Sequence, residues 1–67
     1  MMQIRVNGET RELPVGTSLD ELLGQLGLDR RYLVVEYNGQ PLARERFEGL
    51  RLADGDNLEL VRPVAGG

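Results

Sequence analysis

Two Asn-Gly pairs, each directly after a run of strand-forming residues, constrain the fold of this chain most. Both residues of an Asn-Gly pair tolerate a positive φ, which the tight turn of a two-residue hairpin requires. Met2–Val6 alternates apolar and polar residues before Asn7-Gly8, and the run Thr10–Val15 returns after it. Tyr32–Tyr37, rich in β-branched and aromatic residues, precedes Asn38-Gly39. These patterns predict two hairpins, with Gln40-Pro41-Leu42 as a short edge segment after the second turn.

One helix is predicted between the hairpins. Ser18 and Glu21 have the spacing of a capping box, in which each side chain bonds the other residue's backbone N–H. An apolar stripe at i, i+3, i+4 and i+7 is formed by Leu19, Leu22, Leu23 and Leu26. Gly27 is suited to the left-handed cap that ends such a helix. We expect the stripe to pack on the sheet.

The last strand is predicted over Asn57–Arg62, with Leu58 and Leu60 facing the core and Val61 facing away. The order of hairpin, helix, strand, short segment and strand implies an α+β fold. In it, a mixed sheet of four to five strands carries one main helix packed on one face, and the final strand lies inside the sheet. This is the β-grasp, or ubiquitin-like, arrangement.

Two further segments are given structural roles. Asp54-Gly55-Asp56 is predicted as a turn, because the later ligands of a calcium loop are not in register. Phe47, the single phenylalanine, is expected to close one end of the core.

Composition excludes most chemistry within the chain itself. The 67 residues include no Cys and no His, which removes thiolate metal sites, thiol nucleophiles and imidazole catalysis. A net charge of -3 argues against nucleic acid as a partner. The longest apolar run, Leu33–Val35, is far too short to cross a membrane, and the N-terminus lacks a signal-type core, so we expect a cytoplasmic protein. We expect no catalytic residue, no metal and no bound cofactor.

The sequence closes on Val64-Ala65-Gly66-Gly67. Without Cβ atoms the two glycines can thread a narrow slot, and Gly67 would present its α-carboxylate there. Taken alone, such an end is more often simply frayed. Five residues, 63–67, reach at most about 17 Å beyond a rigid inner strand, which favours delivery of the terminus to a partner. We therefore expect a β-grasp domain over residues 1–62 and a flexible tail over 63–67.

The whole chain resembles the ThiS family, the sulfur carrier proteins of thiamine biosynthesis. The resemblance rests on the following motifs, none specific by itself: Gly16-Thr17-Ser18-Leu19 with Leu22-Leu23, Val35-x-Tyr37-Asn38-Gly39, Arg44, Asp54-Gly55-Asp56 and Ala65-Gly66-Gly67. Many relatives carry proline immediately before the arginine matched by Arg44, where this chain has Ala43.

The resemblance implies a carrier that is not an enzyme. A ThiF-type adenylating enzyme would use ATP and Mg to convert Gly67 to an acyl-adenylate. A persulfide sulfur, supplied by a cysteine desulfurase or another source, would displace AMP, and the thiocarboxylate would serve thiazole synthase, ThiG. Gly66 and Ala65 form the transit strip in this interpretation.

Partners must also hold the carrier by its surface. We hypothesise a docking patch of Val61 and Val64 with Arg62 at its rim. An ordinary exposed strand residue is an equally good interpretation of Val61.

Other functions remain open on the residues alone. A carrier of this fold could serve molybdopterin synthesis, tRNA thiolation or cysteine synthesis. A ubiquitin-like modifier would join Gly67 to amines of other proteins, and a plain interaction module would have an inert tail.

Overall fold

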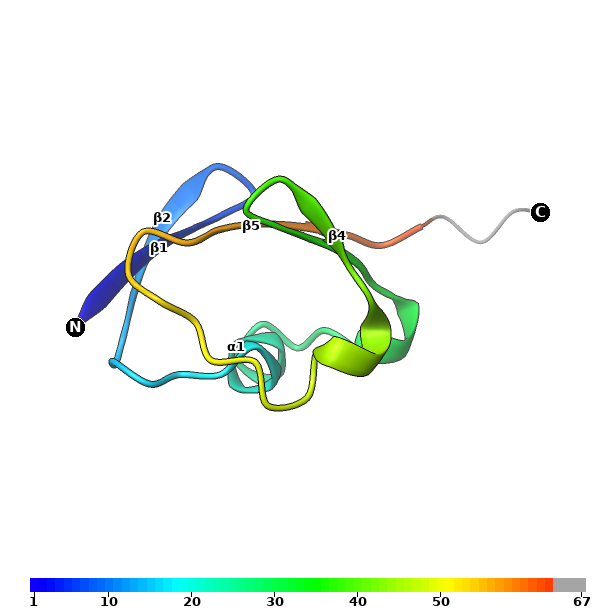
Figure 1. The fold of residues 1–67 in the computed structure, drawn as a ribbon, viewed down its shortest axis with the longest axis horizontal. Helices are drawn as coiled ribbons and strands as arrows, with labels where there is room; N and C mark the ends of the chain where they lie inside the picture. The colour runs from blue at the N-terminus through cyan, green and yellow to red at the C-terminus, as the bar shows by residue number, and fades with distance from the viewer. Residues whose placement is uncertain (64–67) are drawn as a thin grey trace.

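The computed structural model describes residues 1–63, so the predictions for Val64, Ala65, Gly66 and Gly67 lie outside it. Its elements, in chain order, are β1 (Met2–Val6), β2 (Glu9–Leu13), α1 (Leu19–Gln25), the 3₁₀ turn η1 (Arg30–Tyr32), β3 (Val34–Tyr37), β4 (Gln40–Leu42), the 3₁₀ turn η2 (Arg44–Arg46) and β5 (Asn57–Val61). The strands form one sheet in the order β2-β1-β5-β3-β4. Strands β1 and β5 are parallel, and the other neighbours are antiparallel. Helix α1 lies across one face of this sheet (Figure 1). The mixed sheet, the single main helix and the inner position of the last strand are confirmed.

Both hairpin turns form as predicted. Asn7 and Gly8 have φ values of 51° and 84°, and Asn38 and Gly39 have values of 51° and 81°. Two successive positive φ values define the type I′ turn, whose twist matches that of the strands it joins.

The strand after the first turn is shorter than predicted and ends at Leu13. Pro14 has no N–H to donate to the ladder. Its carbonyl instead accepts from the Thr17 N–H at 3.2 Å and from the Thr17 hydroxyl at 2.7 Å. The chain therefore leaves the sheet at Pro14 and turns toward the helix.

The capping box of α1 is confirmed. The Glu21 N–H donates to Ser18 Oγ at 3.1 Å, and the Ser18 N–H donates to Glu21 Oε1 at 3.2 Å. Gly27 has φ 69°, and the Leu28 N–H donates to the Leu23 carbonyl at 2.9 Å. Both features belong to the left-handed end that the glycine predicted.

The strand predicted over 32–37 begins later, at Val34. The Asp29 carboxylate accepts from the Arg31 N–H at 2.9 Å and so starts the 3₁₀ turn η1 instead. Tyr32 therefore lies outside the strand and is exposed. Leu33 and Val35, the two neighbours of Val34, are buried.

The core lies between the sheet and α1. Its buried apolar side chains are Met2, Ile4, Val6, Leu13, Leu19, Leu22, Leu23, Leu33, Val35, Phe47, Leu52, Leu58 and Leu60. Phe47 is 1% exposed, which confirms its predicted place in the core.

Candidate functional site

The end of strand β5 is the point from which the predicted tail would leave the sheet. On one side, β5 pairs with β3 as far as Val61, which lies opposite Val34. On the other side, β1 pairs with β5 only through Arg5–Asn57 and Val6–Leu58 before the chain turns away at Asn7. Hydrogen bonds from β1 alone would leave the last residues of β5 unpaired on this side.

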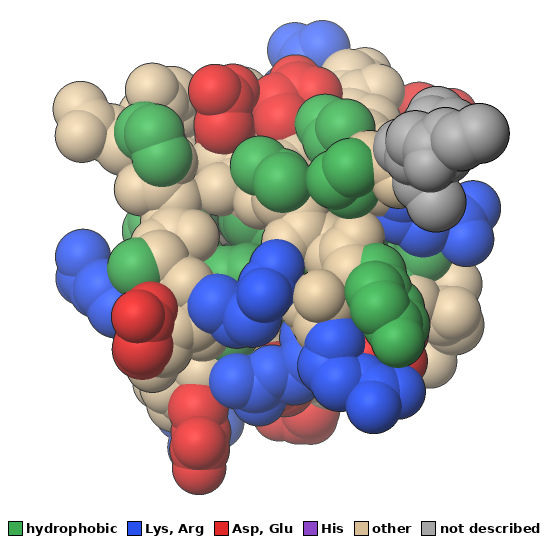
Figure 2. All heavy atoms as spheres, turned by 90° about the vertical axis from the view of Figure 1, so that its right-hand side faces the viewer, with side chains coloured by type: hydrophobic (Ala, Val, Ile, Leu, Met, Phe, Trp, Pro, Cys, Tyr) green, Lys and Arg blue, Asp and Glu red, His purple; other side chains and the backbone are tan. Residues whose placement is uncertain are grey.

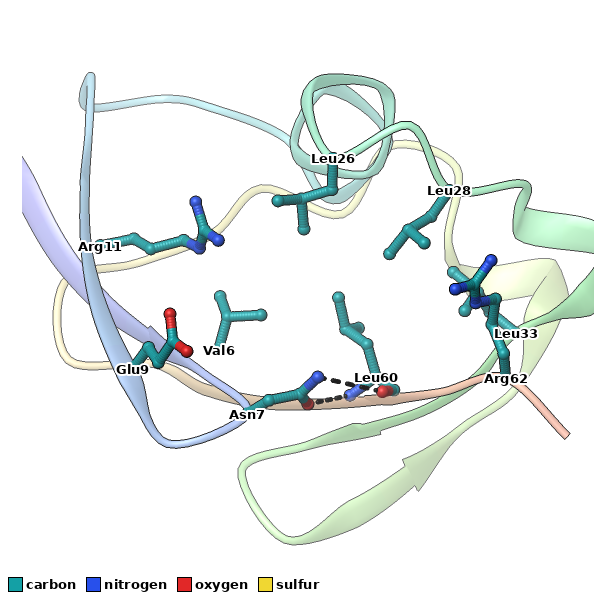
Figure 3. A pocket seen from close by; sticks show the side chains of 9 residues that line it. All are labelled: Val6, Asn7, Glu9, Arg11, Leu26, Leu28, Leu33, Leu60 and Arg62. Carbon is teal, nitrogen blue, oxygen red and sulfur yellow. Dashed lines mark hydrogen bonds between the residues drawn. The ribbon is translucent and has the colours of Figure 1, made fainter.

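The Asn7 side chain takes over where β1 ends. Its Oδ1 accepts from the Leu60 N–H at 2.7 Å, and its Nδ2 donates to the Leu60 carbonyl at 3.2 Å (Figure 3). This amide imitates one more residue of a neighbouring strand. Sequence reasoning assigned Asn7 to the turn alone, because nothing local indicates that β5 passes beside it.

Two exposed valines lie opposite each other near this end. Val34 and Val61 are 50% and 53% exposed and are direct partners across β3 and β5. Because their neighbours Val35 and Leu60 are buried on the helix side, both valines lie on the face of the sheet away from α1. Val61 was predicted to face this way, whereas Val34 was not considered, since its place depends on the strand register. We call these two residues the valine pair.

Arg62 does not lie on the same face of the sheet as Val61. It lines a hollow on the helix side of the sheet (Figure 3). The hollow has a volume of about 380 Å³, and its lining residues are Val6, Asn7, Glu9, Arg11, Leu26, Leu28, Leu33, Leu60 and Arg62. The structure thus separates two residues of the hypothesised patch onto opposite faces, and the third, Val64, lies outside the described residues.

Basic side chains gather at the end of the molecule where β5 leaves the sheet, beside hydrophobic ones (Figure 2). Two arginines of η1 are engaged locally: Arg30 pairs with Asp20 at 3.1 Å, and Arg31 pairs with Asp29 at 2.7 Å. Hydrogen bonds from Arg31 lower the pKa of the Asp29 carboxyl to about 2.

Arg44, part of the resemblance described above, has a structural contact in this chain. It donates to the Leu33 carbonyl at 3.2 Å, which ties η2 to the segment that leads into β3.

Asp56 holds the loop that leads into β5. It is 7% exposed and accepts from the Tyr37 hydroxyl at 2.6 Å, from Asn38 Nδ2 at 3.2 Å and from the Ala53 N–H at 2.8 Å. The hydrogen bond to Asp56, with burial, raises the pKa of the Tyr37 phenol to about 12. The turn predicted at residues 54–56 is therefore an internally bonded structural element.

Residues 1–63 contain no group of three or more His, Cys, Asp or Glu side chains placed to hold a metal ion. Within the same residues, no helix has the length and apolarity needed to span a bilayer.

Comparison with known proteins agrees with this architecture. The ThiS family model matches residues 4–67. The sulfur carrier protein ThiS of Bacillus subtilis is 29% identical over 65 residues, which cover 96% of this chain and 98% of that protein. The thiazole synthases of Paramagnetospirillum magneticum and Magnetococcus marinus are 35% and 33% identical over 66 residues, 98% of this chain. The chain spans only 20% of the length of each synthase.

A solved structure extends the match to three dimensions. The crystal structure of the thiamine biosynthesis protein ThiS from Geobacter metallireducens superposes with a TM-score of 0.81 at 33% sequence identity, covering 98% of this chain and 100% of that one. Because the family model matches nearly the whole sequence and the fold agrees throughout, the chain belongs to the ThiS family.

Proposed function

We propose that this chain is a sulfur carrier of thiamine biosynthesis, and that Gly67 carries the sulfur as a thiocarboxylate. Family membership and the end-to-end match to the Bacillus subtilis sulfur carrier support the first part. The second part follows from chemistry. A chain without Cys, His or Lys lacks the thiol, imidazole and amine groups that commonly carry acyl or sulfur intermediates, whereas a terminal carboxylate on a side-chain-free strip can be activated by a partner.

The observation that carries the proposal is that β5 is hydrogen-bonded on both sides almost to its end. Val61 is paired to β3, and Leu60 is held by the Asn7 amide on the opposite side. Pro63 follows two residues after Val61, and its fixed φ restricts the next step of the chain. A terminus attached to a well-ordered strand loses less conformational entropy when it enters a partner's pocket than one attached to a flexible segment.

The chemistry needs two partner-catalysed steps. A carboxylate oxygen of Gly67 attacks the α-phosphorus of ATP, and pyrophosphate leaves, with Mg held by the adenylating enzyme. A persulfide sulfur then attacks the acyl carbon and AMP leaves. Thiol cleavage of the resulting S–S bond releases the thiocarboxylate. Gly66 and Ala65 would allow the reacting carbon to pass through a slot too narrow for larger side chains.

The proposed partners are a ThiF-type adenylating enzyme, a persulfide donor and a thiazole synthase. The last is supported by two relatives named as thiazole synthases, each of which contains a stretch similar to this chain within a much longer protein. We propose the valine pair as the apolar part of the surface that these partners contact, because it lies at the base of the tail.

The experiment is intact-mass spectrometry after incubation with ATP, Mg, a sulfur source and the adenylating enzyme. We expect a mass gain equal to the replacement of one oxygen by sulfur, and no gain for a variant that lacks Gly66 and Gly67. Circular dichroism would establish that the shortened variant is folded. Sulfur transfer by that variant would contradict the proposal.

The same mass measurement, repeated after each candidate sulfur-accepting enzyme is added, separates the alternatives. A carrier for another pathway would lose its sulfur to that pathway's enzyme and not to thiazole synthase. A protein modifier would instead appear as higher-mass conjugates that resist thiol reagents.

A further inference from the structure

The two edges of the sheet differ in how open they are to another strand. Edge strand β4 has three residues and contains Pro41, which cannot donate to a ladder. Edge strand β2 has five residues, of which only Leu13 is buried, and it contains no proline. Its charged side chains oppose a partner strand of like charge, but they permit one of complementary charge, so β2 is the edge that can accept a suitably charged partner.

The backbone of β2 presents hydrogen-bonding groups at two positions. Thr10 and Glu12 lie opposite Arg5 and Gln3 of β1. The N–H groups of these β1 residues point the other way: Arg5 donates to the Asp56 carbonyl at 2.9 Å and Gln3 to the Asp54 carboxylate at 2.8 Å. Because antiparallel pairs alternate, the N–H and C=O groups of Thr10 and Glu12 face the open edge.

The side chains between these positions carry opposite charges. Glu9 and Arg11 are exposed and share the helix-side face of β2, where both line the hollow described above. Within residues 1–63, neither of them forms an ion pair. A strand with an acid and a base two residues apart is complementary to a copy of itself in antiparallel orientation.

We propose that β2 is a self-association surface, through which two copies of this chain pair edge to edge about a two-fold axis at Thr10. In this register the two Thr10 residues exchange backbone hydrogen bonds. Glu9 of each copy then lies directly opposite Arg11 of the other, which gives two ion pairs. The two sheets become one continuous sheet.

Charge selects this register over its neighbours. Pairing Thr10 with Glu12 of the second copy would set Arg11 against Arg11. Centring the pair on Glu12 would set Glu12 against Glu12. Like charges directly opposite each other destabilise a strand pair, so the arrangement centred on Thr10 is the one without such a clash.

Pairing through β2 does not block the surfaces that the proposed carrier function needs. Strand β5 lies two positions from the β2 edge. A two-fold axis normal to the sheet makes the two β5 strands run in opposite directions. The β5 strands of a pair therefore end at opposite ends of the assembly, and the valine pair of each copy stays uncovered.

The test is sedimentation velocity and NMR translational diffusion of the full chain over a wide concentration range at low ionic strength. We expect concentration-dependent association that weakens with salt, because the ion pairs are exposed. Arg11→Glu and Glu9→Arg should each weaken association at least tenfold. The double variant Glu9→Arg with Arg11→Glu, whose net charge equals that of the parent, should restore it.

Two further measurements identify the surface. Thr10→Pro removes an edge N–H of β2 and should abolish association. The matched control is Pro41→Thr, which changes the edge-facing position of β4 and should not weaken it; amide spectra would confirm that both variants are folded. In a mixed-isotope sample, an intermolecular contact between the α-protons of Glu9 and Arg11 is expected. A protein that stays monomeric at millimolar concentration, or a double variant that fails to restore association, would overturn the proposal. Association that Thr10→Pro leaves intact would also overturn it.

Discussion

At the scale of single residues, Asp56 is the polar group on which the loop before β5 depends. Tyr37→Phe removes one of its three donors, the hydroxyl at 2.6 Å, and leaves the ring in place. We expect a loss of about 1.5–3 kcal/mol in the free energy of unfolding, the usual cost of a hydrogen bond to a charged group. Urea denaturation at pH 7 measures it. Tyr32→Phe is the control, because the Tyr32 hydroxyl has no hydrogen-bond partner within residues 1–63.

The same hydrogen bond makes stability depend on alkaline pH. The pKa of Tyr37 is raised to about 12 in the folded protein, from its ordinary value of 10.0, by the hydrogen bond to Asp56 and by burial. A raised pKa means that the folded state holds the Tyr37 proton more tightly than the unfolded state does. The hydrogen bond therefore contributes fully to the free energy of unfolding below pH 10, and this contribution is lost as the pH rises toward 12. Urea midpoints across this window should fall more steeply for the parent than for Tyr37→Phe. Parallel curves would contradict the assignment.

Asn7 has two roles, which a single substitution can separate. Asn7→Gly keeps a residue that tolerates the φ of 51° but deletes the amide that pairs with Leu60. We expect faster hydrogen exchange at the Leu60 N–H and a loss of about 1 kcal/mol of stability. Unchanged protection of the Leu60 amide would show that the side chain does not hold β5.

At the scale of elements, α1 is short and its stability can be moved in both directions through its glycines. A Cβ at Gly24 would meet nothing within 4 Å, and its φ is not positive, so Gly24→Ala should stabilise the protein by about 0.5–1 kcal/mol. Gly27 has φ 69°, so Gly27→Ala should destabilise it by roughly 1–2 kcal/mol. Thermal unfolding of the Gly24→Ala and Gly27→Ala variants measures both changes in stability. Melting temperatures that shift in the same direction for both variants would contradict this account.

The elements that could be predicted from the sequence are those with local causes. The Asn-Gly turns and the Ser18–Glu21 capping box depend on residues at most three apart, and they formed as expected. Strand boundaries were less accurate, because the Asp29 cap and the Pro14 carbonyl contact compete with strand propensity. The Asn7–Leu60 pair and the valine pair join residues 53 and 27 positions apart. Neither could be found before the sheet order was known.

At the scale of the whole molecule, the fold gives the two faces of the sheet different surroundings. The helix covers one face of the sheet, the valine pair lies on the other, and β5 ends at the end of the molecule where basic side chains gather beside hydrophobic ones (Figures 1 and 2). Sequence reasoning reached the inner position of β5 through the order of elements. It grouped Arg62 with Val61, but strand alternation sends these neighbours to opposite faces.

A docking role for the valine pair predicts a change in partner binding without a change in fold. Val61→Asp and Val34→Asp should each raise the KM for this carrier in adenylation about tenfold, as expected when ~1.4 kcal/mol of binding is lost. Val15→Asp is the matched control, since Val15 is 79% exposed in the loop between β2 and α1, at the end of the molecule away from the end of β5 (Figure 1). Steady-state pyrophosphate release measures KM, and urea midpoints equal to the parent's would exclude unfolding. Equal KM values for all three variants would remove the valine pair from the docking surface, while a selective rise for Val34→Asp and Val61→Asp would assign partner contact to the helix-free face.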